Sequence, residues 1–248
     1  MKRYREHISV RSYDADQDGR LKPGALFNYF QEAAWHHAEM LGFGYAALLE
    51  QELFWVLSRV QLEWLHELRW GDKLTVETWP KGVSRLFALR DFIVRGPDGA
   101  EAIRATSAWL TLDISSKRPR RPEQIMDREV MLEEEHAIED FPGKIVMPTD
   151  LGDVDTRVAR YSDLDVNRHV NNARYVDWLF DALPPNNDNA VPFSRLNVQF
   201  TGEAQWGDEL DVRVDVHSGT STAYASILNR ADERHVFDAV VTGPAALI

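Results

Sequence analysis

Polar side chains with catalytic potential are concentrated in one short stretch of the chain. Asp165, Asn167 and His169 supply a carboxylate, an amide and an imidazole at every second position. If this segment is extended, its alternate side chains point to the same side and these three groups can converge on one point. Asn171 and Asn172 follow and favour the start of a helix, whose first N–H groups would stabilise negative charge that develops in a reaction.

The same stretch also has a purely structural interpretation. Asp-x-Asn sequences before a helix are common in turns and caps, where the side chains accept hydrogen bonds from nearby backbone N–H groups. Asp165 suits that role as well as a catalytic one. The residues of this stretch, taken alone, leave both interpretations open.

Composition excludes several classes of function. The chain has 248 residues, of which 44% are hydrophobic, enough for one large or two small domains with a core. It contains no cysteine, which excludes disulfides, iron–sulfur clusters, thiolate zinc sites and cysteine nucleophiles. The 28 Lys and Arg residues against 40 Asp and Glu give a net charge of −12. We therefore expect no nucleic-acid binding, which needs a broad basic surface.

Neither a membrane span nor a metal site is expected. No apolar run approaches the roughly 20 residues that a transmembrane helix needs, and the first residues lack the apolar core of a signal peptide. We expect a soluble cytoplasmic protein. Residues 14–19 resemble the start of a calcium-binding loop, but Ala25 occupies the position that needs a bidentate carboxylate. We therefore expect no metal and no cofactor.

Two windows of the sequence are repeated. Residues 13–20 align with residues 162–169, and residues 58–72 align with residues 194–208. Repeats of this length indicate two copies of one domain rather than a solenoid array.

Each copy has the pattern of a strand, a helix and four further strands. Apolar residues at helical spacing, over residues 26–41 and 175–183, predict two helices, and Pro23 and Gly24 mark the start of the first. Alternating apolar and polar residues predict the strands. The strand segments are 60–64, 74–76, 87–94, 102–112, 210–216, 222–229 and 235–241.

These elements predict an α+β fold of two tandem hotdog domains, each an antiparallel sheet curled around a central helix. In each copy we expect a leading strand, the helix and then a four-stranded antiparallel meander. The expected boundaries are an N-terminal hotdog domain at 1–114, a linker at 115–149 and a C-terminal hotdog domain at 150–248. The linker is rich in proline and charge, and we expect a short helix near residues 122–130.

Residues 163–172, followed by Tyr175 and Trp178, resemble the active-site signature of the acyl-acyl carrier protein thioesterases in their bacterial form. A second match is residues 200–204, where the family carries a functional glutamate that falls on Glu203. Plant members often have cysteine at the next position, once proposed as a nucleophile. This chain has Ala204 there, so a covalent cysteine scheme cannot operate. The resemblance covers essentially the whole chain and the tandem hotdog layout.

The resemblance implies hydrolysis of fatty acyl–acyl carrier protein to free fatty acid and carrier, without a cofactor. Glu203 is the best candidate for the general base, and His169 can share or relay the proton. Asn167 can orient the water or the thioester, and Asp165 would fix the side chain of Asn167 or His169. The sequence does not show whether Glu203 or His169 removes the proton. Glu67 lies at the matching place in the first copy, which leaves a fold role for Glu203 open.

Substrate contacts are expected from the start of the second-copy helix, at Asn171 and Asn172, where backbone N–H groups can hold an oxyanion. The first copy has lost this chemistry, since Asp18 and Arg20 match Asn167 and His169. We predict that the first copy does not hydrolyse thioesters. Its longer connection, 38–57, either lines a fatty-acyl pocket or belongs to the core.

The expected partner is acyl carrier protein with a phosphopantetheine-linked acyl chain. Carrier proteins are acidic, so the net charge of −12 would oppose binding unless the charge is locally reversed. Residues 117–121 reverse it, with Arg118, Arg120 and Arg121 as expected substrate-binding residues. These residues have two interpretations. They bind the acidic helix of the carrier or the phosphopantetheine phosphate, or they are a solvated linker without a binding role.

Two other functions fit the same residues. An acyl-coenzyme A thioesterase of the hotdog class would use the same chemistry, and a non-catalytic scaffold would bind acyl chains or the carrier without hydrolysis. The preferred acyl chain length does not follow from the sequence. Two fused copies already supply a paired interface, so either a monomer or a homodimer is feasible.

Overall fold

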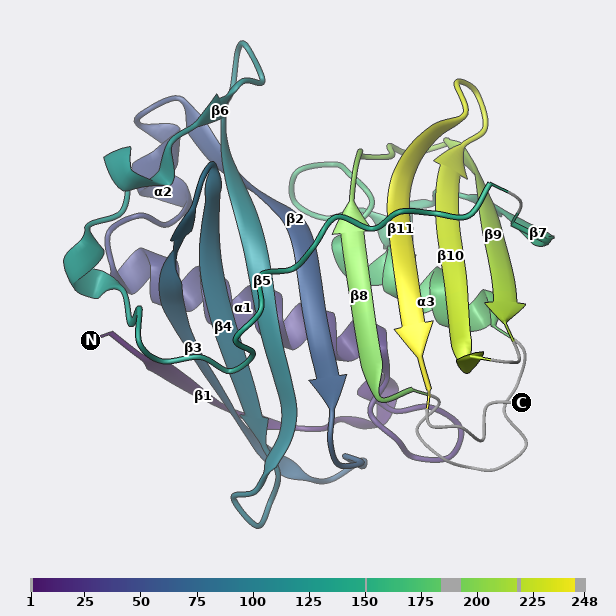
Figure 1. Ribbon diagram of the computed structural model, residues 1–248, viewed down its shortest axis with the longest axis horizontal. Helices are drawn as coiled ribbons and strands as arrows, with labels where there is room; N and C mark the ends of the chain where they lie inside the picture. Colours follow the sequence, from purple (N-terminus) through teal and green to yellow (C-terminus); the bar gives the residue numbers. More distant parts are fainter. Residues whose placement is uncertain (1, 150, 184–192, 218–219, 244–248) are drawn as a thin grey trace. The chain divides into compact units, whose positions relative to one another are not determined.

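The structure is a computed structural model that describes residues 2–149, 151–183, 193–217 and 220–243. The chain divides into two compact units (Figure 1). Unit 1 comprises Met1–Leu21 and Asn28–Pro142, and unit 2 comprises Lys22–Phe27 and Gly143–Ile248. The first turns of the long first helix therefore belong to unit 2.

Unit 1 is an antiparallel sheet with a long helix against one face (Figure 1). Its strands run in the order β1-β3-β4-β5-β2, and β6 pairs with β5. The strands are β1 (Tyr4–Ser9), β2 (Leu53–Trp64), β3 (Lys73–Ser84), β4 (Phe87–Arg95), β5 (Glu101–Asp113) and β6 (Pro119–Arg120). The helices are α1 (Pro23–Met40) and α2 (Tyr45–Leu49), with 3₁₀ turns at Ser12–Asp14, Pro122–Gln124 and Arg128–Val130.

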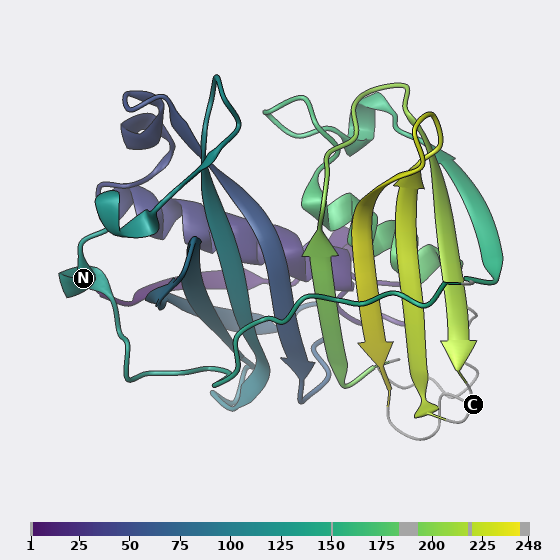
Figure 2. The same ribbon diagram turned by 45° about the horizontal axis from the view of Figure 1, so that its top comes forward.

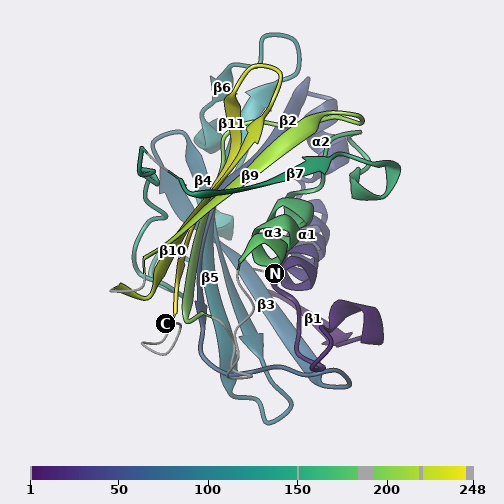
Figure 3. The same ribbon diagram turned by 90° about the vertical axis from the view of Figure 1, so that its right-hand side faces the viewer.

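Unit 2 repeats this arrangement in a shorter form. Its antiparallel strands run in the order β8-β11-β10-β9-β7, and α3 lies against one face of the sheet (Figure 3). The strands are β7 (Asp153–Val158), β8 (Arg195–Phe200), β9 (Glu209–His217), β10 (Thr222–Asn229) and β11 (Arg234–Thr242). The helix is α3 (Asn172–Ala182), and a 3₁₀ turn covers Tyr161–Asp163. The expected hotdog arrangement, a sheet curled around a central helix, is confirmed.

The expected four-stranded meander is wrong. Among the described strands, the meanders comprise three strands each, β3-β4-β5 and β9-β10-β11, while β2 pairs with β5 and β8 pairs with β11. Tight turns at residues 85–86 and 96–100 force β3, β4 and β5 to be neighbours. The connection over residues 65–72 is long enough to leave β2 free to pair at the other edge, which sequence alternation does not reveal.

Apolar helix faces pack against the sheets as the spacing predicts. Phe30 of α1 stacks on Phe92 of β4 with ring centroids 4.4 Å apart, and both are buried. Tyr175 of α3 stacks on Phe237 of β11 at 5.8 Å. Each such buried side chain contributes roughly 1.5–3 kcal/mol of transfer free energy. The helices end slightly earlier than expected, at Met40 and Ala182.

The short helix expected near residues 122–130 is present as two separate 3₁₀ helices, Pro122–Gln124 and Arg128–Val130. Between them Met126 inserts into a core cluster of unit 1. That cluster also contains Phe43 and Leu48 from the 38–57 connection. Those side chains of the connection are therefore core, while its role in lining an acyl pocket stays a prediction.

The rest of the expected linker lies across the sheets. In unit 1 the backbone N–H of Ala137 donates to Asp91 Oδ2 at 2.6 Å, on the buried carboxylate of β4. In unit 2 residues 143–149 cross the sheet face opposite α3, where Ile145 N donates to Gln199 Oε1 at 3.3 Å (Figure 2). Within the described ranges, no helix is long and apolar enough to cross a membrane.

Candidate active site

The polar stretch of unit 2 is a tight hairpin rather than an extended segment. Asp165 N donates to His169 O at 2.9 Å, and Arg168 N donates to Asp165 O at 3.0 Å. Arg168 has a φ of +65°, in the left-handed region. A turn closed by one left-handed residue is a common three-residue hairpin loop. The segment is therefore not extended, and the alternation of side chains along an extended chain does not apply to it.

Asp165 holds the hairpin together. Its Oδ1 accepts the backbone N–H of Asn167 at 2.8 Å and that of His169 at 3.3 Å. Its Oδ2 accepts from Asn167 Nδ2 at 3.4 Å. These contacts serve the turn, and they also place the amide of Asn167 and the imidazole of His169 on one rigid loop.

The hairpin brings His169 to Glu203, far along the chain. His169 Nδ1 lies 3.2 Å from Glu203 Oε2, with side chains 31% and 56% exposed. A β-bridge joins His169 to Gln205, and Val170 N donates to Ala204 O at 2.8 Å. A carboxylate on Nδ1 orients the imidazole and leaves Nε2 for another partner.

Tyr175 holds the loop that carries Glu203, a contact that the sequence did not predict. Ala204 N donates to the Tyr175 hydroxyl at 3.0 Å, and both residues are buried. Burial raises the pKa of Tyr175 well above its usual value. A hydroxyl on the apolar face of the predicted helix was the available signal, because a buried Tyr O–H needs a hydrogen-bond partner.

Asn171 and Asn172 lie at the start of α3. Asn171 is the N-cap, and its side chain accepts the backbone N–H of Ala173 at 2.9 Å. Asn172 is the first residue of the helix. Asn171 thus has a structural contact, while the substrate contacts expected of both residues remain predictions.

Unit 1 contains the same hairpin with different chemistry. Asp16 N donates to Arg20 O at 2.8 Å, and Asp16 Oδ1 accepts the backbone N–H of Arg20 at 2.8 Å. Arg20 Nε lies 3.1 Å from Glu67 Oε2, where unit 2 has His169 and Glu203. A guanidinium stays protonated at all working pH values, so Arg20 cannot take a proton from water as the imidazole of His169 can.

The residues that resemble the start of a calcium-binding loop have contacts within the fold. Asp16 Oδ1 binds backbone N–H groups of its own hairpin, and Asp14 Oδ2 accepts from the Tyr29 hydroxyl at 2.7 Å. In the part of the chain that the structure describes, no group of three or more His, Asp or Glu side chains is arranged to hold a metal.

Comparison with known proteins identifies the family. Residues 1–130 match the family model of the acyl-ACP thioesterase N-terminal domain, and residues 152–239 match that of the acyl-ACP thioesterase C-terminal domain. The chain belongs to the acyl-ACP thioesterase family.

Individual relatives agree with this family. The chain is 28% identical over 242 residues to dodecanoyl-[acyl-carrier-protein] hydrolase, chloroplastic, of Cinnamomum camphora, covering 89% of this chain and 61% of that protein. It covers 47% of the palmitoyl-acyl carrier protein thioesterase, chloroplastic, of Arabidopsis thaliana. The chain therefore spans only about half to three fifths of these curated relatives.

Solved structures of the same length share the fold. An acyl-ACP thioesterase from Bacteroides thetaiotaomicron is 28% identical, with a TM-score of 0.79 and 97% of each chain covered. The 12:0-ACP thioesterase from Umbellularia californica has a TM-score of 0.84 at 24% identity, covering 98% of this chain and 97% of that one. The second likeness shows the fold alone.

The basic run, residues 117–121, is only partly neutralised by acidic side chains. Arg120 Nη2 pairs with Asp113 Oδ2 at 3.0 Å. Hydrogen bonds lower the pKa of the Asp113 carboxyl, and the largest contribution comes from the backbone N–H of Ser116. Arg118 and Arg121 are exposed, and no described residue pairs with either guanidinium.

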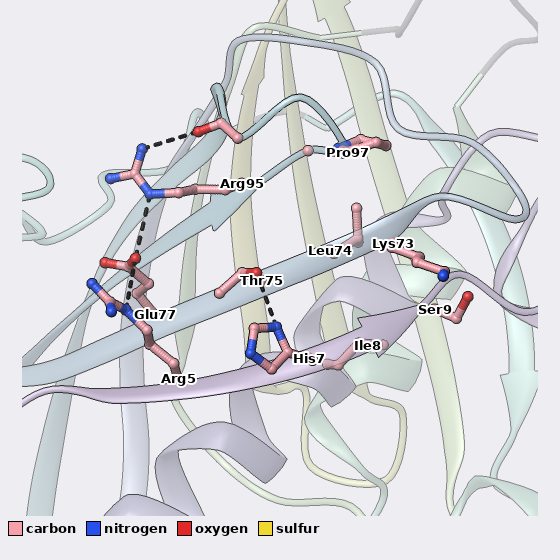
Figure 4. A pocket seen from close by; sticks show the side chains of 12 residues that line it. Arg5, His7, Ile8, Ser9, Lys73, Leu74, Thr75, Glu77, Arg95 and Pro97 are labelled. Atoms are coloured by element: carbon pink, nitrogen blue, oxygen red, sulfur yellow. Dashed lines mark hydrogen bonds and ion pairs between the residues drawn. The ribbon is translucent and has the colours of Figure 1, made fainter.

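A separate groove lies in unit 1 (Figure 4). It has a volume of about 680 Å³ and runs along β1, β3 and the β4–β5 turn. Arg5 Nε and Arg95 Nε approach the same oxygen of Glu77, at 3.1 and 3.4 Å. The groove contains none of the predicted site residues, and its arginines are engaged with a buried carboxylate rather than arranged for catalysis.

Proposed function

We propose that this chain hydrolyses the thioester of fatty acyl–acyl carrier protein, releasing a free fatty acid and the carrier thiol. One observation carries the proposal. In a member of this family, the imidazole of His169 lies 3.2 Å from Glu203, on the hairpin that carries Asn167 and precedes α3.

His169 and Glu203 form one coupled base in this mechanism. They remove a proton from water while the water oxygen attacks the thioester carbonyl carbon, which becomes a tetrahedral oxyanion. The carbon–sulfur bond then breaks, and the pair returns the proton to the sulfur. The products are a carboxylic acid and a thiol, so atoms and charges balance without a covalent enzyme intermediate.

Neighbouring groups stabilise and orient the reacting atoms. The exposed amide of Asn167 orients the water or the thioester, and Asp165 keeps that amide in place. The backbone N–H of Asn172, the first residue of α3, is the donor to the developing oxyanion in this scheme, because the N–H groups of Ala173 and Arg174 already donate to Asn171. One well-placed donor of this kind is worth about 3–4 kcal/mol of the activation barrier.

The carrier is the proposed partner, and its acidic helix docks on the basic run. Arg118 and Arg121 have guanidinium groups available for that helix, whereas Arg120 is held by Asp113. Unit 1 does not hydrolyse in this scheme, since its Arg20 cannot act as a base.

The test compares Glu203→Ala, His169→Ala and Asn167→Ala with Glu67→Ala, the matched change in unit 1. Release of free acid is measured at saturating substrate. We expect turnover to fall at least about a hundredfold in the first two variants and to persist in Glu67→Ala. Near-normal turnover in all three unit 2 variants would contradict the proposal, and an equal loss in Glu67→Ala would assign the glutamates to the fold.

Substrates distinguish the remaining functions. The same acyl group is offered on carrier protein and on coenzyme A, and faster release from the carrier supports the proposal. Binding of acyl chains without hydrolysis of either thioester would instead indicate a scaffold.

A further inference from the structure

Arg168 occupies a backbone position that favours glycine. Its φ of +65° places its Cβ close to its own carbonyl, which disfavours residues with side chains. The matching residue in unit 1 is Gly19, with a φ of +77°. Both residues close their hairpins with the same bond, since Gly19 N donates to Asp16 O and Arg168 N donates to Asp165 O, each at 3.0 Å. The turn itself therefore does not require arginine.

The Arg168 side chain is not used by the fold. It is exposed, and it makes no hydrogen bond or ion pair with another residue in the ranges that the structure describes. Val166 on the same turn is 96% exposed, whereas Gln17 occupies that position in unit 1. The hairpin with the proposed catalytic residues thus presents a cation and an apolar side chain to solvent, at positions where its duplicate has glycine and glutamine.

We propose that Arg168 binds the phosphate of the phosphopantetheine arm that carries the acyl thioester. This inference rests on the proposed function and adds a substrate-binding residue to it. A planar guanidinium can form two charge-assisted hydrogen bonds to a phosphate. Strained residues are retained mainly at functional sites, where another contribution offsets their cost.

The dimensions of the arm agree with this contact. Covalent bond lengths allow at most roughly 15 Å between the phosphorus and the thioester sulfur. Arg168 is adjacent in sequence to His169, so its guanidinium lies within that reach of a thioester held at His169 and Glu203. The net charge of −12 opposes the approach of an anionic arm, and Arg168 supplies a local cation at the hairpin. The phosphate then binds at the hairpin, and the basic run is left to the acidic helix of the carrier.

The decisive experiment varies the phosphate and not the acyl group. One acyl chain is attached to carrier protein, to coenzyme A and to pantetheine, which lacks the phosphate. Arg168→Gly copies the unit 1 residue and relieves the backbone strain, so it should fold normally. We expect its KM to rise about tenfold on the two phosphate-bearing substrates, with kcat unchanged, and to stay constant on acyl-pantetheine.

The matched control is Arg85→Gly. Arg85 is also an exposed arginine with a positive φ, +56°, in the β3–β4 turn of unit 1. Its KM values should equal those of the wild type on all three substrates. Three results for Arg168→Gly would overturn the phosphate contact. The KM could rise equally on acyl-pantetheine, it could stay unchanged on every substrate, or it could rise on the carrier substrate alone.

Calorimetric titration separates this inference from the proposed hydrolysis. Phosphopantetheine and pantetheine are the probes, and wild type should bind the first more tightly while Arg168→Gly loses the difference. If that difference is present but no thioester is hydrolysed, the proposed function fails and the phosphate contact stands. If hydrolysis proceeds and wild type binds both probes equally, the phosphate contact fails and the proposed function stands.

Discussion

Replacing Tyr175 with phenylalanine tests how the Glu203 loop is held. Tyr175→Phe keeps the stacked ring on Phe237 but removes the oxygen that accepts the Ala204 N–H at 3.0 Å. Tyr175 is 1% exposed and Ala204 is 0% exposed, so water cannot easily replace that oxygen. The perturbation therefore leaves one buried N–H group without a partner.

The magnitude follows from the cost of an unsatisfied buried donor, about 1–3 kcal/mol in the free energy of unfolding. For a chain of this length, we expect the Tm to fall by roughly 2–12 °C. Glu203 directly precedes Ala204, so its position relative to His169 loosens as well. A small misplacement of a catalytic group lowers rate strongly, and we expect kcat to fall roughly tenfold.

Thermal melts, amide exchange at Ala204 and release of free acid measure these effects. The control is Tyr224→Phe in β10, because the Tyr224 hydroxyl makes no hydrogen bond within the described residues. Tyr224→Phe should change the free energy of unfolding by less than about 0.5 kcal/mol. Equal melting temperatures for Tyr175→Phe and wild type, with unchanged exchange at Ala204, would refute the reasoning.

Three further predictions concern stability and partner binding. Gly24→Ala should lower the free energy of unfolding by about 1–3 kcal/mol in urea titrations, because the added Cβ would overlap the Asp177 carboxylate; stabilisation, as helix propensity alone predicts, would contradict this packing. Arg118→Ala combined with Arg121→Ala should raise KM for carrier-linked substrate several-fold at low salt, and an unchanged KM would exclude this docking surface. Burial raises the pKa of Asp91, so the folded state disfavours its ionised form; its contribution to stability is present below the unfolded pKa and is lost as pH rises through the folded pKa. Urea titrations at several pH values should therefore show wild type losing stability relative to Asp91→Asn as pH rises from the unfolded to the folded pKa of Asp91. Parallel stability curves for the two proteins would refute this prediction.

Local patterns in the chain were sufficient for its elements. Duplication, helical spacing and strand alternation predicted a strand, a helix and four strands in each copy, because burial of one face imposes a period on the sequence. Strand partners were not predictable in this way. β2 has the alternation of any half-buried strand, and only the path of the 65–72 connection lets it pair with β5.

The hairpin shows how a local signal can be masked. Gly19 marks a left-handed turn position in unit 1, and the aligned residue of unit 2 has the same conformation. Arg168 does not carry the glycine signal, so an extended conformation of the segment around it stayed open. The comparison of the two copies contained the information, since duplicated loops keep their backbone even where residue types change.

The sequence by itself determined which functional groups this protein has: no thiol, an Asp-x-Asn-x-His stretch in one copy, and an arginine in place of the histidine in the other. Only the tertiary structure decided that His169 meets Glu203 at 3.2 Å and that Tyr175 holds the adjoining loop. Residue types and their spacing follow from the chain, whereas contacts between distant segments depend on how the strands pair and the helix packs.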